Sequence, residues 1–276
     1  MTVSQQDKAR RFRELHARAS PFVIANAWDG GSARMLGALG FEAIATSSGA
    51  SAGVLGRVDG KVSRDEALAQ ARVIVAATDL PVSADLEKGF GDSPAVVAET
   101  IRLAAESGLV GGSIEDASGD PAQPIYDFPQ ATERVAAAAA AARALPFPFT
   151  LTARSENYLR GRPDLEDTIR RLQAFERAGA DVLFAPGLPD LAAVRAVCAA
   201  VAKPVNFMVG IKGKSFTVAE LAAAGVRRIS LATSLYRAAM TGLYRAAREV
   251  KEQGTFGYLD DSLTTPQWNE FMQKPR

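Results

Sequence analysis

Two acidic side chains stand at the end of a short apolar run, in the stretch from Val82 to Asp92. If that run is a strand, Asp85 and Glu87 project to the same face, because side chains two residues apart share a face of a sheet. Carboxylate oxygens placed there suit Mg²⁺, which binds one or two carboxylates, keeps several waters and leaves room for substrate oxygens. Mn²⁺ accepts the same ligands and could substitute for it. The alternative is a salt-bridged strand end without a metal.

Acidic residues occur at two more points of the same kind. Glu115 ends another apolar run, and Asp59 lies in a loop that follows one. A magnesium ion bound by Asp85 could have its waters ordered by Asp59, Glu87 and Glu115. Such an ion could chelate a carboxylate oxygen and the adjacent carbonyl oxygen of a 2-oxo acid, and could stabilise the enolate formed next. The acids therefore predict metal-assisted chemistry on a 2-oxo acid.

A carboxylate grip is the second predicted feature. Arg154 offers a planar fork of N–H donors that can bind a carboxylate through two parallel hydrogen bonds. Backbone N–H groups across Ser47, Ser48 and Gly49 could hold the same anionic end, because a Ser/Gly turn lets the main chain approach a ligand closely. The alternative for Arg154 is a buried ion pair with Glu156.

These side chains need elements that bring them to one place, and the chain supplies repeated strand-helix units. Short apolar runs alternate with segments of helical spacing, several of which open on Ser or Asp and close on Gly. Eight such units predict an α/β fold, a (β/α)₈ TIM barrel, whose catalytic groups lie at the carboxyl ends of the strands. The expected strands are 22–27, 43–48, 81–86, 109–115, 149–154, 181–186, 204–209 and 228–233.

The two ends of the chain add to this barrel. We expect one domain over residues 1–276, with an N-terminal helix in 1–20 and a C-terminal helical extension over about 252–276. Phe256, Tyr258, Trp268 and Phe271 make the extension aromatic, and such side chains need a surface on which to dock.

Composition excludes several classes of protein. The 32 Lys and Arg residues nearly balance 31 Asp and Glu residues, so the net charge of +1 favours neither nucleic acid nor an anionic membrane. A single cysteine and a single histidine exclude a Cys/His zinc site, so a metal must be held by oxygen. Cys198 is expected to be a packing residue and His16 a surface residue. With no predicted signal peptide or membrane span, the expected compartment is the cytoplasm.

At its strand-end motifs the chain resembles the isocitrate lyase and phosphoenolpyruvate mutase superfamily. The resemblance implies an Mg²⁺-dependent barrel in which Asp85 binds the metal directly, the other three acids act mainly through water, and Arg154 and the Ser/Gly turn grip a 2-oxo carboxylate. It also implies that the C-terminal extension exchanges a helix with a neighbouring subunit, in a homodimer or homotetramer. The motifs are NAWDGGSAR (26–34), GFEAI (40–44), LGRVD (55–59), DLEKGFGD (85–92), SIED (113–116), TARSE (152–156) and the GAD before the sixth strand.

The chain departs from this superfamily in the loop after the fourth expected strand. The lyases carry a Lys-Lys-Cys-Gly-His motif there and the mutases a Lys-Lys-Asn-Ser type of motif, whereas residues 117–128 read ASGDPAQPIYDF. The loop therefore lacks the thiol that would protonate a leaving enolate, and the cations that would handle a phosphoryl group. Decarboxylation needs neither, because CO₂ departs without prior deprotonation and water can protonate the enolate.

The leading hypothesis is an Mg²⁺-dependent carbon-carbon lyase acting on a small 2-oxo or 2-hydroxy dicarboxylate through an enolate, with oxaloacetate decarboxylation as its simplest form. Arg154 would be a catalytic residue that contacts the substrate. Trp28 would form a wall of the pocket, and Asn206 would reach the distal end of the substrate. Retro-aldol cleavage of a (methyl)isocitrate type is an alternative that requires a base, for which Glu156 and Tyr126 are the candidates.

Three other functions stay open. The first is a protein that binds a 2-oxo acid such as pyruvate or 2-oxoglutarate with little or no turnover. The second is an enzyme of phosphonate P–C chemistry. The third is a phosphate-binding barrel enzyme that uses the GIKGKS loop, Gly210 to Ser215, with Lys212 and Lys214, although a solvated loop explains two lysines equally simply.

Overall fold

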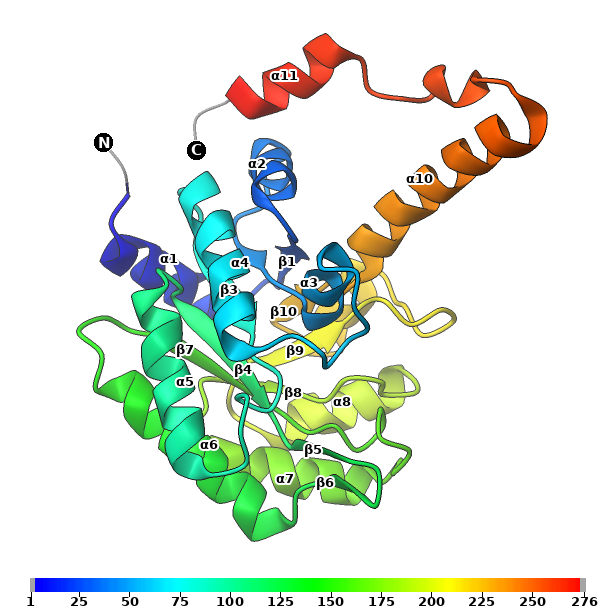
Figure 1. Cartoon of the computed structure of the whole chain (residues 1–276). Helices are drawn as coiled ribbons and strands as arrows, with labels where there is room; N and C mark the ends of the chain where they lie inside the picture. The colour runs from blue at the N-terminus through cyan, green and yellow to red at the C-terminus, as the bar shows by residue number, and fades with distance from the viewer. Residues whose placement is uncertain (1–2, 274–276) are drawn as a thin grey trace.

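The eight predicted strands close into one parallel barrel. The structure, a computed structural model, describes residues 3–273. Around the ring the order is β1, β10, β9, β8, β7, β4, β3 and β2, and helices surround the barrel (Figure 1). The predicted (β/α)₈ fold is therefore confirmed. The strands are Phe22–Asn26 (β1), Ile44–Ala45 (β2), Val82–Asp85 (β3), Gly111–Glu115 (β4), Thr150–Arg154 (β7), Val182–Phe184 (β8), Val205–Met208 (β9) and Arg228–Ser230 (β10).

Most of the helices begin where the sequence supplies a capping side chain. Ser63 and Glu66 form a reciprocal capping box at one helix, and Asp164 caps another. The second of these ends at Gly179, whose φ of 108° lies in the left-handed region that glycine adopts without strain. The helices are Gln5–Ala17 (α1), Gly30–Ala38 (α2), Ser48–Val54 (α3), Arg64–Ala77 (α4), Pro94–Glu106 (α5), Phe128–Arg143 (α6), Leu165–Ala178 (α7), Leu191–Ala200 (α8), Val218–Ala223 (α9), Ser234–Gln253 (α10) and Thr265–Gln273 (α11).

Helix α1 packs across the amino-terminal end of the barrel. Phe12 and Leu15 are fully buried and share a cluster with Phe22, the first residue of β1. The prediction that His16 lies at the surface is wrong, because its side chain is on the same helix face and only 7% of the residue is exposed. Its ring meets those of Phe12 and Phe22 edge to face.

The predicted loop 117–128 contains a small antiparallel hairpin, formed by Ala117–Asp120 (β5) and Gln123–Ile125 (β6). The hairpin is tied to the turn after β3, since Lys88 Nζ donates a 2.6 Å hydrogen bond to the carbonyl oxygen of Ser118. Arg134 on α6 is fully buried and donates to the carbonyl oxygens of Lys88, Gly91 and Asp92. These contacts fix the turn that follows Asp85 and carries Glu87, so this segment sets the positions of two of the predicted metal ligands.

The C-terminal part of the chain leaves the barrel and returns. Helix α10 projects away from the barrel, and after a short 3₁₀ helix (Gly257–Leu259, η1) the chain comes back so that α11 lies over α2 (Figure 1). There Arg34 Nη2 donates a 2.5 Å hydrogen bond to the carbonyl oxygen of Met272. The extension is helical as predicted, and helix exchange between subunits stays a prediction. Within residues 3–273, no helix combines the length and apolar character that crossing a bilayer requires.

Candidate active site

The carboxyl ends of the barrel strands surround a pocket of about 550 Å³. This is the end at which (β/α)₈ barrels carry their catalytic groups. Most of the residues predicted to bind metal or substrate line this pocket, although they come from four separate strands and the segments after them. The predicted residues in its wall are Ser47, Ser48, Gly49, Asp59, Asp85, Arg154 and Asn206.

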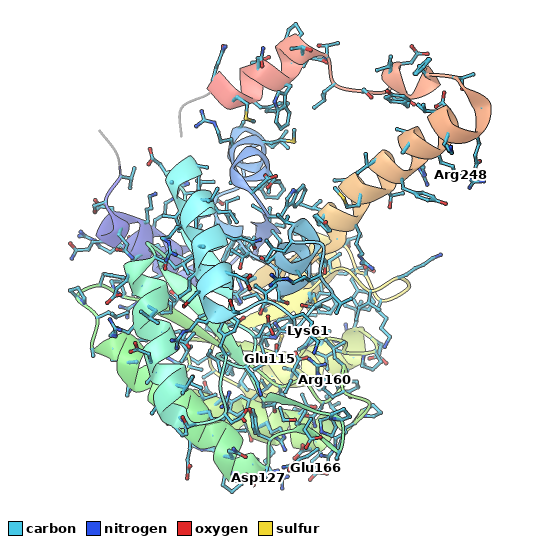
Figure 2. All side chains as sticks on the ribbon, viewed as in Figure 1. Lys61, Glu115, Asp127, Arg160, Glu166 and Arg248 are labelled. Carbon is cyan, nitrogen blue, oxygen red and sulfur yellow. The ribbon has the colours of Figure 1, made fainter. Side chains whose placement is uncertain are left out.

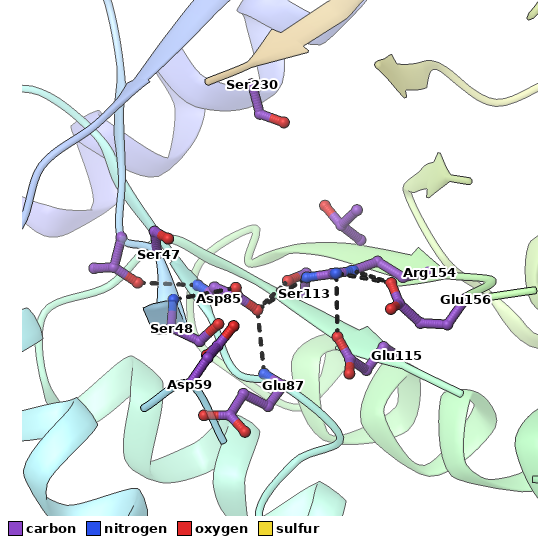
Figure 3. Close-up of polar contacts among 12 residues, drawn as sticks. Ser47, Ser48, Asp59, Asp85, Glu87, Ser113, Glu115, Arg154, Glu156 and Ser230 are labelled. Atoms are coloured by element: carbon purple, nitrogen blue, oxygen red, sulfur yellow. Dashed lines mark hydrogen bonds and ion pairs between the residues drawn. The ribbon is translucent and has the colours of Figure 1, made fainter. Parts of the chain in front are cut away.

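Arg154 lies among three carboxylates at the side of the pocket (Figure 3). Its Nη1 is 3.1 Å from Asp85 Oδ1, and its Nη2 is 3.2 Å from Glu115 Oε2 and 2.7 Å from Glu156 Oε1. Burial alone would lower the pKa of Arg154, but Glu156, Glu115 and Asp85 together raise it well above its ordinary value. The ion pair with Glu156 is thus present, within a larger network that faces the pocket.

Asp85 is held by several donors at once. Its Oδ2 accepts a 3.3 Å hydrogen bond from the backbone N–H of Ser48, and its Oδ1 accepts one of 3.3 Å from that of Glu87 and one of 3.5 Å from Ser113 Oγ. Its own N–H donates to Thr46 Oγ1 at 3.0 Å. The carboxylate therefore has a fixed orientation at the pocket wall.

Glu87 does not extend the strand, so the prediction that it shares a strand face with Asp85 is wrong. Strand β3 ends at Asp85, and Glu87 has a φ of 50°, in the left-handed region. The turn nevertheless leaves the two acids close enough to interact. Burial first, and then the charges of Asp85 and Asp59, raise the pKa of Glu87 to about 7.

The Ser/Gly turn lies between Asp59 and Asp85. Ser47 caps α3, accepting a hydrogen bond from the N–H of Ala50, and the N–H of Ser48 is already used by Asp85. A Cβ atom at Gly49 would lie 3.3 Å from Asp59 Oδ2. Glycine therefore lets the Asp59 carboxylate approach the turn, and two predicted sites, the metal acids and the carboxylate grip, form one cluster.

Two glutamates stand behind Arg154. Burial raises the pKa of Glu115, and Glu156 adds to that shift, whereas Arg154 opposes it. Glu156 has no exposed surface, and its Oε2 accepts no hydrogen bond from the described residues, although Arg160 Nη2 is 3.5 Å away. Arg160 also approaches Glu115 Oε1 at 3.3 Å, and Figure 2 shows these two side chains near each other.

A buried network positions Glu156 from below. Its backbone N–H donates a 2.7 Å hydrogen bond to Asp116 Oδ1, and Asp116 Oδ2 pairs with Arg171 Nη1 at 3.1 Å. Arg171 also pairs with Asp167 on the same helix at 2.8 Å. The strand end that carries Arg154 and Glu156 is therefore anchored to α7.

Two predicted residues lie away from this cluster. The hydroxyl of Tyr126 donates a 2.5 Å hydrogen bond to Asp92, and its ring packs under the guanidinium of Arg134. Tyr126 does not line the pocket, because the hairpin turns its side chain toward the turn 88–92. Trp28 meets the ring of Tyr236 edge to face at 5.5 Å, and only Tyr236 reaches the pocket.

Two other sequence features are also outside the site. Cys198 on α8 packs partly buried against the core, as predicted, and burial raises the pKa of its thiol to about 11. Gly210 and Ile211 line the pocket, whereas Lys212 and Lys214 do not. The geometry therefore does not place the two lysines of that loop around a bound phosphate.

The structure adds pocket residues that sequence reasoning missed. Ser83 and Ser113 stand two residues before Asp85 and Glu115, and Arg228 and Ser230 face inward from β10. The usable signal was the two-residue alternation of a strand, which gives the residue two before a strand-end acid the same inward direction. Arg228 is the first residue of β10, and no acidic residue follows it two positions later, so the sequence did not indicate that its side chain faces the pocket.

The acid cluster fits Mg²⁺ that is bound largely through water. Among residues 3–273, no group of three or more His, Cys, Asp or Glu side chains is close enough to enclose a metal directly. Mg²⁺ does not need such a cage, since it usually keeps several waters and takes one or two carboxylates. The raised pKa of Glu87 beside Asp85 and Asp59 indicates negative charge that a cation would neutralise. Asp85 would hold the ion, with Asp59, Glu87 and Glu115 around its waters.

A closed (β/α)₈ barrel with acids, an arginine and a Ser/Gly turn at its carboxyl end has the arrangement of a barrel enzyme. The chain belongs to the phosphoenolpyruvate phosphomutase family, whose model matches residues 12–251, within the isocitrate lyase and phosphoenolpyruvate mutase superfamily. The predicted family is therefore confirmed.

Relatives of this chain are described as lyases or mutases. A crystal structure from Burkholderia cenocepacia, whose description leaves open whether it is a lyase or a mutase, has a TM-score of 0.96 and 52% identity over 98% of this chain and 97% of its own. The oxaloacetate decarboxylase of Pseudomonas fluorescens is 31% identical over 91% of this chain and 87% of its own. The 2-methylisocitrate lyase of Escherichia coli is 28% identical over 95% and 91%, respectively.

Proposed function

We propose that this protein is an Mg²⁺-dependent carbon-carbon lyase for a small 2-oxo or 2-hydroxy dicarboxylate, and that its simplest reaction is decarboxylation of oxaloacetate. The observation that carries the proposal is the contact of Arg154 and Asp85 in the pocket wall, with the carboxylates of Asp59, Glu87, Glu115 and Glu156 around them. The names of the two curated relatives, an oxaloacetate decarboxylase and a 2-methylisocitrate lyase, support the same reaction class.

Bound Mg²⁺ would supply positive charge that stabilises the negative charge developing on the substrate oxygens. Arg154 would donate N–H groups to the substrate carboxylate, and its orientation is fixed by Glu115 and Glu156. In decarboxylation the bond between C3 and C4 breaks, its electron pair enters the C2–C3 bond of an enolate, and CO₂ leaves. The enolate then takes a proton at C3 from water, so this reaction requires no residue from the hairpin.

Retro-aldol cleavage of a 2-hydroxy acid is the second candidate, and Glu156 is the observation that favours it. The reaction needs a base for the hydroxyl proton. Glu156 Oε2 is buried near Arg154 and accepts no hydrogen bond from the described residues, although Arg160 Nη2 is 3.5 Å away, so its lone pairs could accept a substrate proton. Tyr126 is not a candidate in this geometry, because its hydroxyl is bonded to Asp92.

Oxaloacetate and Mg²⁺ test the leading proposal directly. NMR should show pyruvate forming faster than in protein-free buffer, and EDTA or Asp85→Ala should reduce the rate to that of the buffer. A rate that is the same for the wild type and Asp85→Ala would refute the decarboxylase proposal. If the protein cleaves a 2-alkylmalate or an isocitrate into a 2-oxo acid and a second carboxylic acid, and does not turn over oxaloacetate, it is the retro-aldol enzyme.

A further inference from the structure

The floor of the pocket contains a buried arginine that the proposed mechanism does not use. Arg228 opens β10, is 5% exposed and lines the same pocket as Asp85 and Arg154. Across the barrel interior its Nη2 donates to Thr152 Oγ1 on β7 at 3.0 Å. Thr152 is two residues before Arg154 on β7, so the residue that Arg228 contacts leaves the strand about 7 Å deeper in the barrel than Arg154 does.

All the hydrogen-bonding partners of this guanidinium are neutral. Nε donates to Asn206 Oδ1 at 2.8 Å, Nη2 donates to Thr152, and Nη1 is 3.4 Å from His16 Nε2. No ion pair within residues 3–273 involves Arg228, whereas Arg154 has three acids. Because a guanidinium has five N–H donors, two of them are left after these three contacts.

His16 does not compensate this charge, and it is held neutral by its surroundings. Its Nδ1 is 2.8 Å from the carbonyl oxygen of Phe12, so this nitrogen carries the proton and Nε2 is the acceptor for Arg228. Burial, and next the charge of Arg228, lower the pKa of His16 to about 3. The positive charge at the pocket floor is therefore unbalanced by any neighbouring acid.

The space above Arg228 is lined by small polar side chains. Ser83, Ser113 and Ser230 line the pocket between the floor and the acids, and a barrel interior is more often filled by bulky branched residues. Figure 3 shows Ser230 on the opposite side of the site from Asp85 and Arg154. A short ligand chain that starts at Arg154 can thus continue inward along hydroxyl groups.

We propose that Arg228, with Asn206 and Thr152, forms an anion subsite at the floor of the pocket, and that it receives the second carboxylate of a short dicarboxylate. The proposal rests on the proposed function for the headgroup at Arg154 and adds the place where the other end of the substrate binds. A buried arginine without an acidic partner is stabilised by a carboxylate, which can accept the two remaining N–H donors. A separate small carboxylate, not attached to the substrate, would satisfy the same N–H donors. The experiments therefore distinguish the substrate's second carboxylate from such a free anion.

Two 2-oxo acids of equal chain length test the subsite by calorimetric titration in the presence of Mg²⁺. 2-Oxoglutarate ends in a carboxylate and 2-oxopentanoate in a methyl group. We expect the wild type to bind the first at least about tenfold more tightly, and Arg228→Met to lose this preference while binding 2-oxopentanoate normally. Arg227→Met is the matched control, since Arg227 is the adjacent residue and does not line the pocket. Arg228→Lys, which keeps the charge, should retain part of the preference and replaces Arg228→Met if that variant does not fold.

Sodium formate is the probe for a free anion. If the subsite exists, formate should raise the thermal midpoint of the wild type and Arg227→Met more than that of Arg228→Met at equal ionic strength. Formate dependence without a dicarboxylate preference would assign the subsite to a free carboxylate and overturn the substrate role. An equal response of all variants in both experiments would overturn the subsite itself. Failure of both 2-oxo acids to bind the wild type would instead refute the proposed headgroup function, and the formate experiment would still decide on Arg228.

Discussion

At the scale of single residues, Asp85 is the side chain on which the proposed chemistry depends. Its carboxylate is oriented by the N–H groups of Ser48 and Glu87 and by Arg154. Asp85→Asn keeps the shape but removes the charge, so the metal-dependent rate should fall roughly 100-fold or more. The measurement is kcat/KM for oxaloacetate over a range of Mg²⁺ concentrations. Asp65→Asn, a change of the same kind on the exposed side of α4, should leave kcat/KM unchanged; a similar loss in both would contradict the role of Asp85.

Glu156 distinguishes the two candidate reactions. Decarboxylation needs no base, so Glu156→Gln should slow it by less than about tenfold, through the weaker hold on Arg154. Retro-aldol cleavage needs a base and should slow by roughly 100-fold or more. Rates with oxaloacetate and with a 2-hydroxy dicarboxylate measure the difference, and Glu166→Gln, on the exposed face of α7, is the control. Equal losses for the two substrates would show that Glu156 acts only through Arg154.

Residue chemistry at the strand ends was readable from sequence, but side-chain direction was not always. Asp85, Arg154 and Glu115 were placed correctly because each ends an apolar run. Glu87 was placed in the strand because a strand end cannot be read to one residue, and the left-handed turn begins there. The position of Tyr126 in the loop after the fourth expected strand suggests a catalytic role, and only the hairpin contacts show that it faces Asp92.

At the scale of elements, helix α1 controls the state of the only histidine in the chain. His16 has a folded-state pKa of about 3, below the ordinary value of 6.5. The unfolded chain therefore binds more protons between these values, so His16 contributes stability that is fully present above pH 6.5 and is lost as the pH falls toward 3. NMR should show one imidazole whose shifts do not change between pH 5 and pH 8. A titration midpoint near 6.5 would contradict the buried placement.

The same element shows why a helix can be predicted while its buried face cannot. The polar sequence of α1 suggested a solvated helix, yet Phe12 and Leu15 turn one face toward the barrel, and His16 lies next to them. Arg228 is a parallel case in a strand, because a charged residue at a strand start is usually exposed. Its inward direction follows from the register of β10 with β1 and β9.

At the scale of the whole molecule, the C-terminal arm, which consists of α10, η1 and α11, exposes an apolar stripe. Met240, Leu243 and Tyr244 on α10 are 37%, 61% and 63% exposed and lie three and four residues apart, on one helix face. We propose that this face and the extension join copies of the chain, and we expect light scattering to show a homodimer or homotetramer. Leu243→Ser with Tyr244→Ser should yield monomers, whereas Val58→Ser, at an exposed apolar residue outside the arm, should not. A monomeric wild type would contradict the proposal.

Helix α10 also forms part of the wall of the candidate active-site pocket. Tyr236 and Arg237, in its first turn, line the pocket, and Arg237 Nη2 donates to the carbonyl oxygen of Gly210. The 20 residues of α10 span about 30 Å, so this one helix connects the pocket to the far end of the C-terminal arm. Dilution that separates the copies would remove the intermolecular contacts of α10, and turnover per chain should then decline. Over a roughly thousandfold range of enzyme concentration, the rate should then fall below proportionality to enzyme concentration at the dilute end. A rate that stays proportional would show that association of the copies through α10 does not affect the pocket.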